Sequence, residues 1–248
     1  DESTIAINSI WSVFEDNSKR IWLGTWQSGV DVIDQYYRKF EHYFYKPGIN
    51  SLSHDNVKDI IEDGNGNLYI STDGGGLTFF DRQKGKFKEY VHNPNNPQSL
   101  SADAALALEY DDNGNLWIGT WNGGVNVFNI RNETFGHYTP DNSRISAPHI
   151  FDIVNTGNGK MYCATWGGGL CSYDQNTGKW KAYRHDPDIN HSICSDYIFS
   201  LYYDSSDRLW IGTSNGLDVL NTKSGTDAKF EHYKNNENDS SSLSNNTI

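Results

Sequence analysis

The pentapeptide LWIGT at residues 116–120 decides the fold, because close variants of it recur along the chain. The variants lie at residues 21–25, 68–72, 161–165 and 209–213, and successive closing threonines are 47, 48, 45 and 48 residues apart. A second marker, an Ile or Leu that opens each unit, keeps a similar interval at positions 5, 52, 100, 145, 193 and 243. Two markers in step indicate internal repeats. We place the units at about 5–51, 52–99, 100–144, 145–192 and 193–242, with the start of a sixth at 243–248.

Each unit contains four strand-like pieces. In the best-formed examples these are an apolar piece (57–61), the pentapeptide, a piece that follows a glycine turn (125–129), and a piece that starts with an aromatic residue and ends with Tyr (135–138). Four short strands with tight turns, repeated about every 40–50 residues, are typical of a β-propeller blade. The sequence therefore predicts an all-β β-propeller region over residues 1–248 with five four-stranded blades. The alternative is a β-sandwich or β-barrel, but neither fold requires a repeat of constant length.

Composition agrees with a β-rich fold and narrows the partners. Aromatic residues make up 14% of the chain and there are 23 glycines, and strands favour aromatics while tight turns favour Gly. The formal charge of −12 disfavours nucleic acid and anionic lipid as partners, and no apolar run approaches the ~20 residues of a membrane span. The three cysteines are too few for a disulfide framework. Cys163 and Cys171 flank one turn and either pair or remain thiols, and Cys194 is left over.

The repeated motif resembles a known family. Glu-Asp-x-x-Gly-Asn-Leu-Trp-Ile-Gly-Thr, then Gly-Gly-Gly-Leu, an aromatic-x-x-Tyr piece and a Ser-Leu-Ser spacer resemble the two-component regulator propeller repeat. The resemblance covers all five units. It is closest at residues 116–125 and weakest at 161–165, where Cys163 and Ala164 replace Ile and Gly.

The resemblance implies a function. Repeats of this family form the periplasmic sensor region of hybrid two-component sensor histidine kinases in Bacteroidetes, typically as two seven-bladed propellers before a β-sandwich, a membrane helix and a kinase. It thus implies that this chain is a fragment of a larger, seven-bladed-type sensor that recognises oligosaccharides from polysaccharide breakdown. It further implies self-association in the parent sensor, and no catalysis, membrane insertion or cofactor in this fragment.

Two other functions remain open. Five-bladed glycosidases and lyases use carboxylates in the axial funnel, and Asp59, Asp103 and Asp152 lie on or near the innermost strands. The third hypothesis is a scaffold for protein–protein contact, which the fold alone does not exclude.

Candidate ligand-binding residues come from positions that vary between units. The residue after the closing Thr lies at a glycine turn, and flat aromatic rings there could stack on sugars. The alternative is that these rings cap the core between blades. The five residues are Trp26, Asp73, Trp121, Trp166 and Ser214.

The loop before each first strand is expected on the same face. It supplies polar candidates that could contact a glycan or serve only as solvated turn residues: His54, Asp55, Asp103, His149 and Tyr197. One aligned first-strand position holds Trp11, Lys58, Leu106, Phe151 and Phe199, and the sequence leaves open which way it faces.

Metal binding is not expected. The loops at 63–67 and 111–115 resemble calcium loops but lack the twelve-residue spacing with a distal Glu. His42, His137 and His232 share a fourth-strand position on separate blades, which is too far apart for a shared zinc ion, and should face solvent or pack on aromatic rings.

Overall fold

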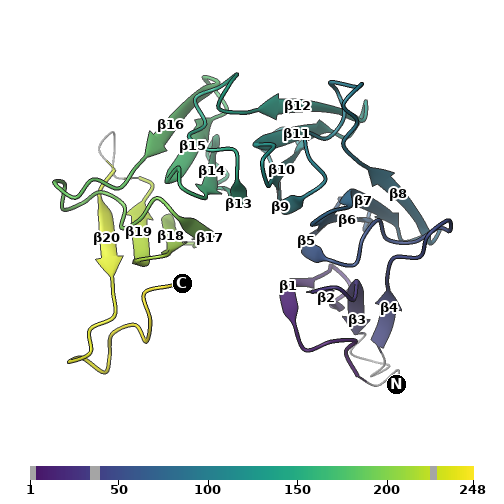
Figure 1. Cartoon of the computed structure of the whole chain (residues 1–248), viewed down its shortest axis with the longest axis horizontal. Helices are drawn as coiled ribbons and strands as arrows, with labels where there is room; N and C mark the ends of the chain where they lie inside the picture. Colours follow the sequence, from purple (N-terminus) through teal and green to yellow (C-terminus); the bar gives the residue numbers. More distant parts are fainter. Residues whose placement is uncertain (1–3, 34–39, 224–227) are drawn as a thin grey trace. The chain divides into compact units, whose positions relative to one another are not determined.

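The computed structural model describes residues 4–33, 40–223 and 228–248, which form twenty strands and no helix. None of these residues belongs to a helix long and apolar enough to cross a bilayer. The strands make five antiparallel four-stranded sheets in which sequence neighbours are also spatial neighbours, as Figure 1 shows for each sheet. The all-β prediction with five four-stranded propeller blades is confirmed. The chain divides into two compact units, residues 1–108 and 109–248, which we describe separately.

The first unit contains two complete sheets. One consists of β1 (Ile10–Glu15), β2 (Ile21–Thr25), β3 (Val30–Ile33) and β4 (Phe40–Tyr43). The other consists of β5 (Val57–Glu62), β6 (Leu68–Thr72), β7 (Gly76–Asp81) and β8 (Lys86–Tyr90). The third sheet begins with β9 (Ala105–Tyr110), which spans the boundary between the units.

The second unit contains the remaining strands. The third sheet continues with β10 (Leu116–Thr120), β11 (Val125–Asn129) and β12 (Thr134–Tyr138). The fourth consists of β13 (Ile150–Asn155), β14 (Lys160–Thr165), β15 (Leu170–Asp174) and β16 (Lys179–Tyr183). The fifth consists of β17 (Ile198–Tyr203), β18 (Arg208–Thr213), β19 (Gly216–Asn221) and β20 (Phe230–Tyr233).

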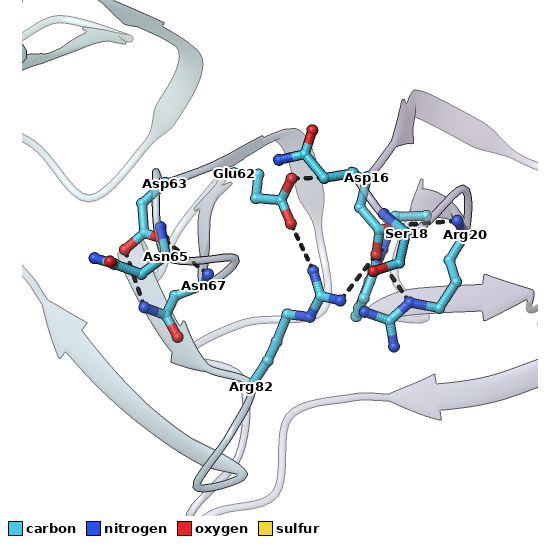
Figure 2. A network of polar contacts seen from close by, with 10 residues as sticks. Asp16, Ser18, Arg20, Glu62, Asp63, Asn65, Asn67 and Arg82 are labelled. Carbon is cyan, nitrogen blue, oxygen red and sulfur yellow. Dashed lines mark hydrogen bonds and ion pairs between the residues drawn. The ribbon is translucent and has the colours of Figure 1, made fainter.

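An aspartate closes the first hairpin of most sheets. The carboxylate of Asp16 accepts backbone N–H groups from Ser18 and Arg20 (Figure 2). The same carboxylate also accepts the indole N–H of Trp22 at 2.9 Å. The same indole bond recurs six residues apart between Trp117 and Asp111 at 3.1 Å, and between Trp210 and Asp204 at 2.9 Å. The acidic turn and the Trp of the repeat are therefore one structural unit.

The loop at 63–67, which resembles a calcium loop in sequence, uses its aspartate for the same turn. Asp63 accepts N–H groups from the backbones of Asn65 and Asn67 and from the Asn67 amide (Figure 2). Beside it, Arg82 bridges two sheets of the first unit, since its guanidinium lies 3.0 Å from Asp16 and 2.9 Å from Glu62.

The glycine of the pentapeptide allows one sheet to pack on the next. A Cβ at Gly119 would meet Ile150 Cγ2 at 2.8 Å and the Ile150 carbonyl at 3.1 Å, and a Cβ at Gly24 would meet Val57 Cγ1 at 2.8 Å. At Gly212 the corresponding neighbour is the carbonyl of Ile248, at 2.9 Å. The residue that begins the first strand of the next sheet, or Ile248 at the corresponding position, therefore lies against the glycine of the preceding sheet.

Stacking of neighbouring blades is expected to bury the tryptophans of the pentapeptide between them. Trp22 is 1% exposed and contacts Phe80 of the second sheet, and Trp117 is 2% exposed and contacts Tyr173 and Trp180 of the fourth. The prediction is confirmed for these two. Trp210 of the fifth sheet is only partly buried, because no sheet follows β20 among the described residues.

Candidate ligand-binding site

The closing Thr of each pentapeptide fixes the turn that displays the next residue. Its hydroxyl donates to a glycine carbonyl at the far side of the turn, at 2.8 Å for Thr25, Thr120 and Thr213 and at 2.7 Å for Thr165. The predicted candidates at the following position thus project from a rigid turn, not from a flexible loop. Isolated antiparallel β-bridges also hold the turn beside the loop that precedes the next sheet. These bridges join Asp73 to Ala104 and Trp166 to Tyr197.

A β-bulge settles which way the aligned first-strand residues face. The pairing between the first and second strands shifts at Trp11, Lys58, Phe151 and Phe199, so each is the extra residue of a bulge. A bulge redirects its extra residue out of the regular alternation of the strand. These four side chains therefore turn toward the residues that follow the closing threonines.

In the second unit six rings meet and form a continuous surface. The ring centroids of Trp121 and His149 are 4.2 Å apart and stacked, and Phe151 lies 5.7 Å from Trp121. The remaining members lie around Trp166. We call this set the second-unit surface; it consists of Trp121, His149, Phe151, Trp166, Tyr197 and Phe199.

Trp166 and Phe151 are the centre of the second-unit surface. Trp166 lies 5.5 Å from Phe151, 4.9 Å from Tyr197 and 5.4 Å from Phe199, measured between ring centroids. Trp121, Trp166 and Tyr197 are 37%, 36% and 45% exposed, whereas the two phenylalanines are partly buried beneath them. Exposed aromatic side chains that gather on one face of a protein often mark a binding site.

The corresponding positions of the first unit have a different chemistry. The Lys58 ammonium lies 3.4 Å from the ring centroid of Trp11 and 5.8 Å from that of Trp26, and the two rings are 5.4 Å apart. Burial lowers the pKa of Lys58, and the carboxylate of Asp73 acts in the opposite direction. We call this set the first-unit surface; it consists of Trp11, Trp26, Lys58 and Asp73.

The predicted aspartates Asp55 and Asp103 have partners within the fold. Asp55 accepts the backbone N–H of Tyr45 at 2.6 Å, and Asp103 accepts that of His92 at 2.6 Å. Asp196, which the sequence interpretation did not select, accepts the N–H of His185 in the same way and also pairs with Arg184. The same bond to a backbone N–H therefore recurs at Asp55, Asp103 and Asp196, which indicates a structural role for these aspartates.

The other polar candidates lie close to their turns. Ser214 bonds to Ser195 at 2.8 Å between hydroxyl oxygens, and the Nδ1 of His54 accepts the backbone N–H of Asn56. The Nδ1 of His149 accepts the N–H of Asn122, which holds the imidazole flat against Trp121. Of the polar candidates, only His149 and Tyr197 belong to the second-unit surface.

The carboxylates considered for catalysis connect neighbouring strands. Asp59 accepts the backbone N–H of Leu108 at 2.8 Å, and Asp152 accepts that of Leu201 at 2.6 Å. Each also accepts the N–H of the residue that follows it, at 2.8 Å. Carboxylates used in this repeated way stabilise packing between innermost strands.

Two histidines of the fourth strands have an aspartate partner in addition to the surroundings that the sequence predicted. His42 and His232 face buried aspartates, with Nδ1 2.7 Å from Asp31 and 2.6 Å from Asp218. Both aspartate side chains are fully buried. The expectation of solvent-facing or ring-packed histidines is confirmed for these two, since His42 stacks on Phe40 and His232 is exposed. The carboxylate that the third strand of each sheet places opposite the imidazole was not predicted.

The sheet architecture and the site geometry define a β-propeller with an exposed aromatic surface. A family model described as two component regulator propeller matches residues 4–27, 51–74, 99–122 and 192–215. Four segments of the chain thus match the repeat of this family, which confirms the predicted resemblance. The family model does not match the pentapeptide of the fourth sequence repeat, in which Cys163 and Ala164 replace Ile and Gly.

Solved structures of the same fold support the class. The extracellular domain of a proposed hybrid two component system from B. thetaiotaomicron superposes with a TM-score of 0.69 at 22% identity, covering 98% of this chain and 37% of that one. A second such domain from B. thetaiotaomicron gives 0.75 at 21% identity, over 92% of this chain and 31% of that one. PorZ, a surface component of the type-IX secretion system of Porphyromonas gingivalis, gives 0.66 at 18% identity, over 91% and 34%.

These structures are only distantly similar in sequence to this chain, and the chain matches only part of each. At these identities the likeness shows the fold, and the chain spans only about a third of the length of each structure. No curated protein matches the chain.

Proposed function

We propose that this chain is part of the extracytoplasmic sensor region of a hybrid two-component system, and that it binds oligosaccharides through the second-unit surface. The observation that carries the proposal is the six-ring surface itself, in which Trp121, Trp166 and Tyr197 are exposed beside one another. The structures of similar fold include extracellular domains of proposed hybrid two component systems, which supports a sensor role and an extracytoplasmic, periplasmic location.

The chemistry of the surface suits sugars. A pyranose ring has an apolar face of C–H groups and a rim of hydroxyls, so it stacks on an aromatic ring and keeps its hydroxyls in water. Tyr and Trp combine a large apolar body with a polar N–H or O–H, and such rings are favoured where one side of the contact is wet. The chain also has a net charge of −12, which favours neutral oligosaccharides over polyanionic ones.

The role in signalling concerns the longer protein. In the proposed system this region binds the ligand, and a histidine kinase elsewhere in the parent protein responds to occupancy. Self-association of the parent sensor belongs to the same proposal. The proposed role needs no catalytic group in this chain, in keeping with the structural use of Asp59 and Asp152.

Titration calorimetry with a panel of neutral oligosaccharides tests the proposal. For an oligosaccharide that binds, Trp121→Ala and Trp166→Ala should each weaken affinity about 10-fold, because loss of one stacked ring costs on the order of 1.4 kcal/mol. The melting temperature should change little for Trp121→Ala, since the ring is exposed.

Tyr202 provides the matched control. It lies on β17, is 66% exposed, and is not part of the second-unit surface. Tyr202→Ala should leave affinity unchanged. Equal losses in all three variants, or turnover of the oligosaccharide that Asp152→Asn abolishes, would contradict the proposal.

A further inference from the structure

The fifth sheet brings three different metal-ligating side chains together. Cys194 lies in the loop before β17, Asp218 on β19 and His232 on β20, and their candidate ligand atoms all lie within 4.8 Å of one another. Cys194 Sγ is 3.2 Å from His232 Nδ1, which is 2.6 Å from Asp218 Oδ1. We propose that these three residues bind a divalent transition-metal ion, with Zn²⁺ the best match.

The three donor atoms, a sulfur, a nitrogen and an oxygen, indicate which metal ion is preferred. A thiolate and an imidazole suit zinc, and a carboxylate completes a three-residue set that leaves a fourth tetrahedral position for water. Zinc bonds of about 2.0–2.3 Å place ligand atoms about 3.3–3.6 Å apart. The sulfur–nitrogen distance is already close to this value, and the nitrogen–oxygen distance must widen by less than about 1 Å. Asp218 and His232 are directly paired across β19 and β20, so side-chain rotation alone can provide that change.

The contacts of His232 are compatible with a metal ion at Nδ1. Its Nε2 lies 3.0 Å from the carbonyl oxygen of Asn190, and its Nδ1 faces the carboxylate of Asp218. A neutral imidazole has one N–H and can satisfy only one of these two acceptors, whereas an imidazolium, or an imidazole with a metal ion on Nδ1, suits both. With a metal ion on Nδ1, the Nε2–H still donates to the Asn190 carbonyl, which is the usual outer contact of a metal-bound histidine.

Burial leaves the site closed except at the histidine. Cys194 is 5% exposed and Asp218 is fully buried, whereas the imidazole of His232 is 25% exposed and offers a path for entry. The second carboxylate oxygen of Asp218 accepts the backbone N–H of Cys194 at 2.7 Å, which holds that carboxylate in place. Burial and the carboxylate raise the pKa of Cys194 to about 12, while Lys234 acts in the opposite direction. Metal binding must therefore displace the thiol proton.

The first sheet contains the same arrangement without the thiol. Asp31 accepts the backbone N–H of Ala6 at 2.7 Å and lies 2.7 Å from His42 Nδ1. Position for position, Ala6 corresponds to Cys194, Asp31 to Asp218 and His42 to His232. The aspartate–histidine pair is thus a recurring feature of the fold, and the thiol is the addition that makes the fifth sheet a metal site.

Binding of Zn²⁺ and Co²⁺ to the whole chain tests the inference. Calorimetry should find one tight Zn²⁺ per chain, and Co²⁺ should give the near-ultraviolet absorption of a thiolate–cobalt bond. Cys194→Ala and His232→Ala should each weaken Zn²⁺ affinity at least about 100-fold, and Cys194→Ala should remove the thiolate band. Ala6 shows that alanine is compatible with this position of the repeat, so Cys194→Ala should fold.

The control is His42→Ala, which removes the equivalent histidine where no thiol is present. It should leave Zn²⁺ affinity unchanged, and Cys163 and Cys171 remain in every variant to report other thiol binding. A wild-type chain without the thiolate–cobalt band would overturn the inference. Equal effects of His42→Ala and His232→Ala would do the same.

Discussion

The first-unit and second-unit surfaces use the same positions of the repeat for different chemistry. In the second unit the bulge residues are Phe151 and Phe199, and both join a surface of rings only. In the first unit the bulge residues are Trp11 and Lys58, and the ammonium of Lys58 lies over the Trp11 ring. The backbone device is shared, so the difference comes from the side chains alone.

This comparison separates the scaffold from the site. The threonine that closes the turn and the bulge in the first strand recur in both units, because every sheet must pack on its neighbour in the same way. The residue at the bulge differs between sheets, although Phe151 also packs against the hydrophobic core of the second unit. If the surfaces bind ligands as proposed, the bulge residue should influence which ligands each surface accepts, and exchanging it should exchange their properties.

The largest effect is expected when the second unit receives the charge of the first. Phe151→Lys places an ammonium among Trp121, Trp166 and Phe199 in place of a ring that contacts all three. We expect affinity for a neutral oligosaccharide to fall about 100-fold, and stability to fall by about 1–3 kcal/mol because the charge gains no carboxylate partner of the kind that Asp73 provides near Lys58. Titration calorimetry and urea unfolding measure the two effects.

Phe151→Leu is the control for this substitution. Leu106 occupies the aligned position of β9, so leucine is compatible with the repeat. Affinity should fall less than in Phe151→Lys, since apolar contact remains while ring stacking is lost. Equal affinity of both variants and the wild type would show that Phe151 lies outside the binding surface.

A smaller effect on stability is expected when the charge of Lys58 is removed from the first-unit surface. Lys58→Met removes the charge and keeps an apolar side chain of similar length beside Trp11 and Trp26. The lost cation–π contact and the relieved burial of charge oppose each other, so the free energy of unfolding should change by less than about 1 kcal/mol. Oligosaccharide binding at the second-unit surface should stay within about twofold. A large loss of binding would instead place the ligand on the first-unit surface.

The sequence predicted the scaffold well because the scaffold repeats. The pentapeptide, its glycine turn and its spacing were sufficient to define five four-stranded sheets, and burial of Trp22 and Trp117 followed from stacking. The bonds from Trp22 and Trp117 to the aspartate six residues earlier were missed, although the repeated motif places an aspartate before the tryptophan. A side-chain bond across a hairpin needs the pairing register, which spacing alone does not provide.

The site was predictable only in part, for a physical reason. Trp121 and Trp166 were selected because they vary at a fixed turn, and both lie on the second-unit surface. The orientation of Phe151 and Phe199 could not be predicted, because a bulge depends on how two strands pair and not on the alternation within one strand. Asp55 and Asp103 were selected as variable loop residues, yet each accepts a backbone N–H from the segment that follows the preceding fourth strand.

The smallest effect concerns the pH dependence of the first-unit surface. Burial lowers the pKa of Lys58 in the folded chain, so the folded state loses this proton at a lower pH than the unfolded state does. Between the folded pKa and the unfolded value of about 10.4, the unfolded chain binds more protons, and stability relative to Lys58→Met should rise with pH. Urea unfolding of both proteins from about pH 8 to about pH 10.5 measures this difference. A difference that falls with pH would mean that the Trp11 ring and Asp73 stabilise the ammonium by more than burial costs, and that the first-unit surface is adapted to hold a charge.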